Sequence, residues 1–395
     1  MLQLIRRFSK VVTAVESNPA DMVGEELAAS LVEYTQAMEM IHDKNYSMAE
    51  LELYRCMEII EKSGFYAEPA YNFVLHRLAL VQRAQRKFSH CERSLEEIVR
   101  NYKNNEKKYP KQLEFAYGTL FKQYLTSNVP KALEFADFLY KPDNWNNMTR
   151  DFQKDVRFFF GTALILHGQY FLKAKTELFE CLKMNPGGNS CFVFHNLACA
   201  QWFHIRKFAD VSPKDLPAEF EYEFKNATTE FAEAIPNFQK SIQLFEGFSD
   251  AFTIESELSL KNKLSGMSLT NIAEIHMEKL EVEKAVQWLQ TALKFYEEND
   301  KGNIGRTLAL IATIMKAKKN LLQAEGIIKN ALELLKGKND YSEILALHTY
   351  ASLLKNLEKR SKESEEMYSK AKTIAASLPF WYERSVHLHI PTWTI

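Results

Sequence analysis

Apolar and small residues recur along this chain at spacings of three and four, and this periodicity predicts amphipathic helices over most of its length. The clearest example is the stretch 268–298, where Leu269, Ile272 and Ala273 fall on one face of a first helix. Ala285 and Leu289 fall on one face of a second helix that follows directly. The pattern therefore predicts helices that come in consecutive antiparallel pairs.

A small residue recurs about every 40 positions, at the same phase of the second helix of each pair. The series is Ala49, Cys91, Ala132, Ala174, Ala234, Ala285, Ala324 and Ser364. A small side chain at a fixed phase lets two helices approach closely, and a run of such pairs stacks into a solenoid. We therefore expect an all-α fold, a superhelical solenoid of about eight antiparallel helix pairs. The regular period argues against the alternative, a compact helical bundle without repeats.

This pattern resembles the tetratricopeptide repeat (TPR). The resemblance rests on the small-residue series, with Tyr46 ahead of Ala49 and Phe88 ahead of Cys91, and it covers residues 24–377. The period is nearer about 40 residues than the family's 34 or so, which indicates longer helices or turns. The unit at 116–139 lacks most of the consensus. The resemblance implies a protein that binds other proteins.

Composition supports helices and limits the partners. The 395 residues include only 13 glycines and 11 prolines, which disfavours a β-rich fold. The formal net charge of -1 gives no electrostatic footprint for nucleic acid over the whole chain. No apolar run is long enough to cross a bilayer, so we expect a protein that is soluble or peripheral to a membrane.

Residues 1–23 have the features of a targeting segment followed by a linker. The first 15 residues hold Arg6, Arg7 and Lys10, and the first acidic residue is Glu16. A basic, amphipathic, acid-free segment resembles a mitochondrial presequence. We therefore predict a mitochondrial protein, in the matrix or associated with the inner membrane. An ordinary first helix with two arginines is the alternative.

The repeats divide into an amino-terminal block at 24–205 and a carboxy-terminal block at 227–378. Between them, at 206–226, we predict an insertion, because Ala174 and Ala234 are 60 positions apart, about 20 more than the period. Prolines in this stretch argue against a continuous helix. Insertions in repeat arrays map to loops on one face, often the binding face. Its candidate partner contacts are Phe220, Tyr222 and Phe224.

The last segment, 379–395, is an aromatic tail with two further candidate contacts, Trp381 and Trp393. Apolar residues and histidines alternate over 386–390, which is typical of an extended segment. The tail can fold back as a cap over the last hydrophobic face, or it can enter a neighbouring subunit. Each of the five aromatic candidates can equally well pack within its own chain.

The reactive side chains form no constellation for chemistry. An odd number of cysteines at irregular spacing does not fit a disulfide framework, and we expect them to act as small hydrophobes in the core. They are Cys56, Cys91, Cys181, Cys191 and Cys199. No phosphate-binding or catalytic motif is found. We therefore predict no enzyme, no cofactor and no small-molecule substrate.

The histidines give no metal site by their spacing. His387 and His389 form an isolated pair without further ligands nearby. The spacings of His195 and His204, near Cys191 and Cys199, do not converge on one face, so zinc is not expected.

Two binding functions are also disfavoured. Some tetratricopeptide proteins hold a terminal carboxylate with Lys, Asn and Arg on successive first helices. Here Thr270 and Glu274 stand where the Lys and Asn would be, and Arg306 is a lone cation. The basic and aromatic stretch 100–111 suits a solvated loop between helices better than a nucleic-acid surface.

Taken together, these features predict a non-enzymatic scaffold for protein–protein interaction. The specific hypothesis is an accessory subunit or assembly factor of a large mitochondrial complex, with the respiratory chain or ATP synthase ahead of the mitochondrial ribosome. Its partners would be other protein subunits. The alternatives are an RNA-binding repeat protein and a cytosolic adaptor for a peptide ligand.

Overall fold

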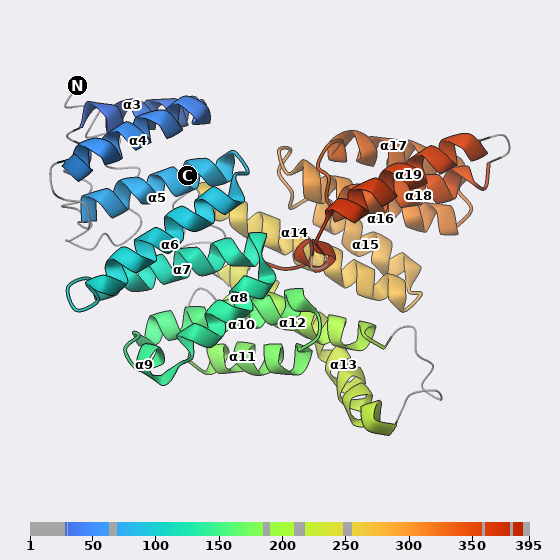
Figure 1. Cartoon of the computed structure of the whole chain (residues 1–395). Helices are drawn as coiled ribbons and strands as arrows, with labels where there is room; N and C mark the ends of the chain where they lie inside the picture. The colour runs from blue at the N-terminus through green and yellow to red at the C-terminus, as the bar shows by residue number, and fades with distance from the viewer. Residues whose placement is uncertain are drawn as a thin grey trace. The chain divides into compact units, whose positions relative to one another are not determined.

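The computed structural model describes residues 28–29, 31–62, 69–184, 190–208, 218–247, 255–357, 360–379 and 382–389. All regular secondary structure in these ranges is helical, as Figure 1 shows. The prediction of an all-α fold is confirmed.

Sixteen of the eighteen helices in these ranges form eight consecutive pairs, the predicted number. The pairs are α3 (Val32–His42) with α4 (Tyr46–Lys62), α5 (Pro69–Ala84) with α6 (Phe88–Asn104), α7 (Pro110–Ser127) with α8 (Val129–Leu139), α10 (Arg150–His167) with α11 (Phe171–Lys183), α12 (Ser190–Arg206) with α13 (Ala218–Gly247), α14 (Glu255–Glu278) with α15 (Val282–Leu293), α16 (Lys301–Ala317) with α17 (Leu321–Leu335), and α18 (Tyr341–Leu354) with α19 (Ser361–Ser377). Two short helices, α9 (Pro142–Trp145) and α20 (Tyr382–Ser385), stand outside the pairs.

The small-residue series does what its spacing predicts. Each of its eight members lies in the second helix of a pair and is at most 4% exposed. Glycines on first helices serve the same purpose. A Cβ atom at Gly161 of α10 would lie 2.8 Å from Cγ of Leu178 on α11, and one at Gly305 of α16 would lie 2.5 Å from Cγ of Leu335 on α17. The helices of these pairs are therefore too close to accept a side chain at the crossing.

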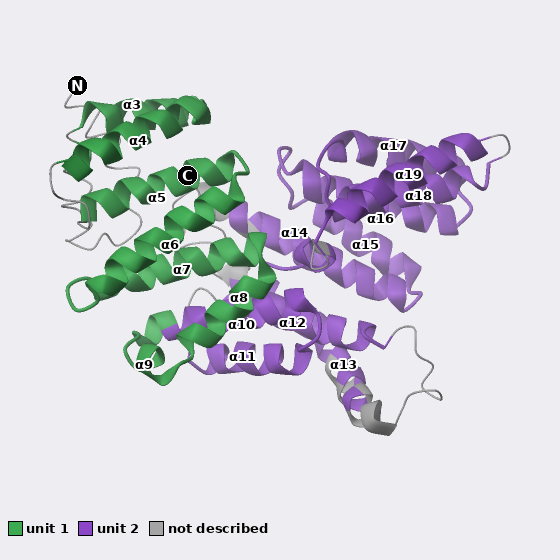
Figure 2. Ribbon diagram, in the orientation of Figure 1, with its two compact units in different colours: residues 1–152, 391–395 green, residues 153–390 purple. Residues whose placement is uncertain are grey.

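Contacts divide the chain into two compact units, coloured separately in Figure 2: residues 1–152 with 391–395, and residues 153–390. The boundary lies within α10. The predicted blocks and insertion remain predictions, because the middle of the insertion, 209–217, lies outside the described residues. The second part of the insertion, from Ala218, is the start of α13.

In the first unit, the pair α7 and α8 packs through aromatic rings, which explains its poor match to the repeat consensus. The ring centroid of Tyr117 lies 5.8 Å from that of Phe135 and 6.0 Å from that of Phe138. Phe121 meets Phe135 edge-on at 5.7 Å. Aromatic pairs at these distances stabilise a core beyond the area that they bury. Thr149 caps the helix that follows, α10, because its Oγ1 accepts a hydrogen bond from the backbone N–H of Phe152 at 3.3 Å.

In the second unit, successive pairs share apolar clusters. Ala273, Ala285 and Leu289 of α14 and α15 pack with Leu310 and Ile314 of α16. The same arrangement continues from α16 through α18, where alanines face leucines and isoleucines. These clusters hold each pair to the next, as expected for a repeat array whose units contact their neighbours.

Candidate functional site

The four residues that follow α20, Val386–His389, lie against α10, α12, α14 and α16 of the second unit. We call them the tail segment, and we call the helix side chains that contact it the tail site. The tail site comprises Phe158, Phe192, His195, Asn196, Cys199, Trp202, Phe203, Asn271 and Arg306.

Most polar contacts of the tail site go to the backbone of the tail segment. Nδ2 of Asn196 donates to the carbonyl oxygen of His389 at 2.9 Å, and Oδ1 of Asn196 accepts from the N–H of the same residue at 2.9 Å. The side-chain amide thus pairs with the peptide backbone much as a neighbouring β-strand would. Such a contact is independent of the identity of the side chain that it holds.

The carbonyl oxygen of His387 is the most contacted atom of the segment. It accepts hydrogen bonds from Nε2 of His195 at 2.8 Å, from Nδ2 of Asn271 at 3.0 Å and from Sγ of Cys199 at 3.2 Å. Since Nε2 of His195 donates, its Nδ1 accepts from the hydroxyl of Ser268, at 2.7 Å. Two helices, α12 and α14, therefore converge on one peptide carbonyl.

The two histidine rings of the segment enter different surroundings. The His387 ring meets Trp202 and Phe203 edge-on, with centroids 5.1 and 5.3 Å away. Its Nδ1 accepts from Nη2 of Arg306 at 2.6 Å. The His389 ring stacks on Phe192 with a centroid separation of 4.0 Å and lies 6.3 Å from Phe158.

Arg306 links the segment to an ion pair with Glu274, in which the arginine is buried and the carboxylate is half-buried. The residue is 1% exposed, its Nη1 donates to the carbonyl oxygen of Val386 at 2.9 Å, and its Nη2 contacts the carboxylate of Glu274. Arg306, the one cation at the positions of a carboxylate clamp, is therefore engaged in an internal ion pair. Glu274, which stands at one of the two positions that differ from the carboxylate clamp, supplies the negative charge that allows Arg306 to be buried.

Burial favours the neutral forms of His195, His387 and Cys199. It lowers the pKa of His195 to about 4, against the effect of the His387 carbonyl, while the charge of Arg306 lowers it further. Burial and then the charge of Arg306 also hold the pKa of His387 well below its usual value. Burial raises the pKa of the Cys199 thiol well above its usual value, so this thiol acts as a donor and not as a thiolate nucleophile.

One sequence-based expectation about these residues needs correction. His195 and Cys199 are four positions apart on α12, so they share a face, and they converge on a backbone carbonyl. In the described part of the chain, no group of three or more histidine, cysteine or acidic residues is arranged to hold a metal ion. All five cysteines are buried, as expected of small hydrophobes.

The tail segment also differs from the sequence-based expectation. It follows a short helix, α20, and its hydrogen bonds go to α12, α14 and α16, which belong to earlier pairs than the last helix, α19. A cap over the last hydrophobic face does not describe these residues. The signal that could have found the site is the run of polar residues in the apolar helix α12, where His195, Asn196 and Gln201 are all buried.

The side chains of the five aromatic partner candidates lie outside the described part of the chain. Phe220, Tyr222 and Phe224 belong to α13, but their side chains lie outside the described part. Trp381 and Trp393 lie outside the described residues altogether. All five stay predictions.

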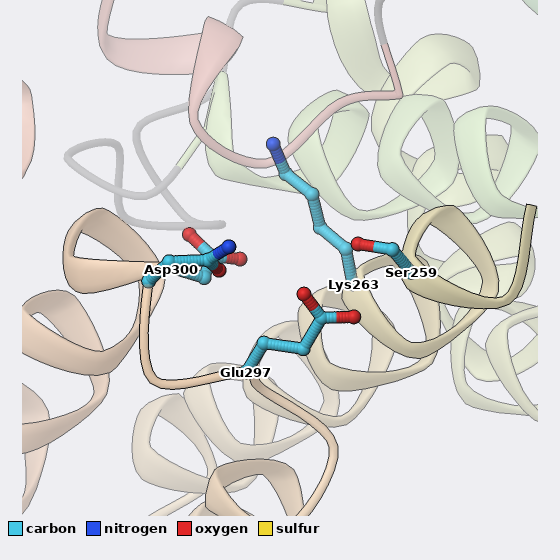
Figure 3. Close-up of a pocket in the computed structure, with 5 residues that line it drawn as sticks. Ser259, Lys263, Glu297 and Asp300 are labelled. Atoms are coloured by element: carbon cyan, nitrogen blue, oxygen red, sulfur yellow. The ribbon is translucent and has the colours of Figure 1, made fainter. Parts of the chain in front are cut away.

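A polar hollow of about 230 Å³ lies where α14 meets the loop before α16, shown in Figure 3. Ser259, Lys263, Glu297, Asn299 and Asp300 line it. Asp300 already caps α16, because its carboxylate accepts from the N–H and the side-chain amide of Asn303. The hollow therefore presents no pair of free carboxylates for acid–base chemistry, and the absence of enzymatic activity stays a prediction.

Comparison with known proteins adds little. No family model matches the chain, and no curated protein matches its sequence. Similar solved structures include the apo form of the quorum sensor NprR from B. thuringiensis, at 13% identity and a TM-score of 0.29, covering 74% of this chain and 99% of that chain. Another is the APC/C hetero-tetramer Cut9–Hcn1, at 12% identity and a TM-score of 0.30, covering 91% of this chain and 76% of that chain. Scores this low support no statement about function, so the fold class rests on the helix pairs themselves.

No helix in the described residues is both long and apolar enough to span a membrane.

Proposed function

We propose that this chain is a non-enzymatic scaffold that binds proteins through short peptide segments laid across its first helices. The observation that supports the proposal is the tail site. There, side chains of α12, α14 and α16 hold the tail segment through backbone carbonyl and amide groups of three residues, Val386, His387 and His389. Helices from several successive repeats that form hydrogen bonds to one peptide backbone are suited to binding a chain segment by shape and hydrogen bonding.

The more specific proposal is an accessory subunit or assembly factor of a large mitochondrial complex, of the respiratory chain or ATP synthase. It is supported by the basic, acid-free sequence of residues 1–15. Fusion of residues 1–20 to a fluorescent reporter should direct the reporter to mitochondria. A diffuse cytosolic signal would instead favour a cytosolic adaptor.

Affinity purification of the tagged full-length chain, with and without nuclease and over a range of salt concentrations, tests the scaffold function. We expect a defined set of proteins, recovered in constant ratio, whose recovery does not depend on RNA. Recovery of RNA that falls steeply with salt, with proteins lost after nuclease treatment, would favour the RNA-binding alternative.

A further inference from the structure

We propose, building on the scaffold function above, that the tail site is a peptide-binding site whose own tail segment is a displaceable occupant. The ligand class that the site fits is a partner segment with an imidazole ring, one apolar residue and then a second aromatic or imidazole ring. In the structure these three places are taken by His387, Leu388 and His389.

The backbone contacts give the site its general affinity for peptide. Asn196 pairs with the N–H and the C=O of one residue, and Arg306, His195 and Asn271 donate to two further carbonyl groups. None of these bonds requires a particular side chain on the ligand. A partner segment with the same backbone path would satisfy all of them.

The rings give the site its selectivity. The first ring position offers a hydrogen-bond donor, Nη2 of Arg306, beside the edges of Trp202 and Phe203, so it selects a ring that carries an acceptor. A neutral imidazole meets this requirement and a phenyl ring does not. The second position offers the flat face of Phe192, which accepts any stacked ring.

The polar groups of the site need an occupant. His195, Asn196 and Asn271 are fully buried, and each directs a donor at the tail backbone. The tail segment itself contributes to this burial, so removing a peptide would exchange these hydrogen bonds for bonds to water beside apolar rings. The helix clusters from α14 to α18, in contrast, are built without the tail segment. The site is thus complete only with a bound segment, and that segment need not be its own.

A cleavable full-length chain tests the proposal. A recognition sequence for a specific protease is inserted between Pro379 and Phe380, and the purified chain is cut and dialysed. A fluorescent synthetic peptide of residues 383–391 is then titrated by anisotropy, with far-UV circular dichroism as the measure of folding. The uncut chain is the control, because its tethered tail competes at high effective concentration.

We expect the cut chain to stay helical and to bind the labelled peptide at least tenfold more tightly than the uncut chain. Replacing the first histidine of the peptide by phenylalanine should weaken binding at least tenfold, whereas the same change at the second should have an effect of threefold or less. Asn196→Ala in the cut chain should weaken binding of every peptide.

Loss of helicity on cutting would show that the tail segment is a fixed part of the fold, and it would overturn the proposal. So would a folded cut chain that binds no peptide, or one that binds all variants equally. Each of these three results would leave the scaffold function intact if purification still recovers protein partners. A chain that exchanges its tail but recovers no partner would contradict the scaffold function instead.

Discussion

The side-chain amide of Asn196 and the backbone of His389 form two hydrogen bonds, each 2.9 Å long, between residues 193 positions apart. Asn196 is held in place by a third bond, from its Nδ2 to Oγ1 of Thr162 on α10. This pairing fixes the end of the tail segment against α12. It also explains why a buried helix of mainly apolar residues contains an asparagine at this position.

Asn196→Ala should loosen the tail segment without unfolding the array. Each lost hydrogen bond contributes about 0.5–1.5 kcal/mol, so exchange of the His389 amide hydrogen should accelerate by about tenfold or more. Hydrogen exchange followed by mass spectrometry measures this directly. Asn147→Ala, at an exposed position in the first unit, is the matched control and should leave the tail unchanged. If the tail segment of Asn196→Ala is as well protected from hydrogen exchange as that of the wild type, the pairing of Asn196 with His389 does not hold the segment in place.

Arg306→Met should destabilise the protein by about 3–5 kcal/mol, because it leaves the Glu274 carboxylate without its buried countercharge. The double variant Arg306→Met with Glu274→Gln should be more stable than the single variant, since no unpaired charge remains. Urea unfolding followed by circular dichroism gives both free energies. A double variant as unstable as the single one would mean that the cost comes from lost packing.

Stability should fall as the pH is lowered from 7 to 5. The pKa of His195 is about 4 in the folded chain and about 6.5 when unfolded, so protons bind preferentially to the unfolded state. The contribution of His195 to the free energy of unfolding is complete above a pH of about 6.5, and it is lost progressively as the pH falls toward 4. This one group should remove about 2 kcal/mol of the free energy of unfolding between pH 7 and 5.

The pH effect can be assigned by variants. His195→Gln removes the titrating ring, so its stability should depend less steeply on pH than that of the wild type. The pKa of His387, lowered by burial and by Arg306, adds to the same trend, with Glu274, Arg206 and His195 as the other titratable groups that face it. Identical pH profiles for wild type and His195→Gln would contradict this assignment.

Gly305→Ala should cost about 1–3 kcal/mol, because its Cβ would overlap Leu335 where α16 crosses α17. Gly326→Ala, in the interior of α17, is the matched control. Nothing lies within 4 Å of a Cβ built there, and alanine favours a helix by about 0.5–1 kcal/mol over glycine. Thermal unfolding of the two variants should therefore shift in opposite directions. Equal shifts would show that close approach of the helices does not govern their packing.

Much of the fold could be predicted because the signal is local and repeated. The phase of Ala285 relative to Leu289 and of Ala324 relative to Ile328 places the small residue at each helix crossing, and both alanines are buried. The pair α7 and α8 could be predicted less well, because aromatic packing around Tyr117 and Phe135 accompanies the small residue Ala132.

The tail site could not be predicted from spacing, because it joins residues that are remote in sequence. Asn271 and His387 are 116 positions apart, and no periodicity relates them. Alternation over 386–390 suggested an extended segment, but residues 386–388 form a turn and a bend directly after α20, and no pattern indicated where they lie. The burial of an arginine at position 306 also depends on Glu274, whose role appears only when α14 and α16 are side by side.

The mass of the native particle tests the central claim most directly. A native gel of the endogenous protein, with mass spectrometry of the band, should find it far above its chain mass of 45.8 kDa, together with other protein subunits. Migration at the mass of one chain, with no protein accompanying it, would contradict a scaffold role.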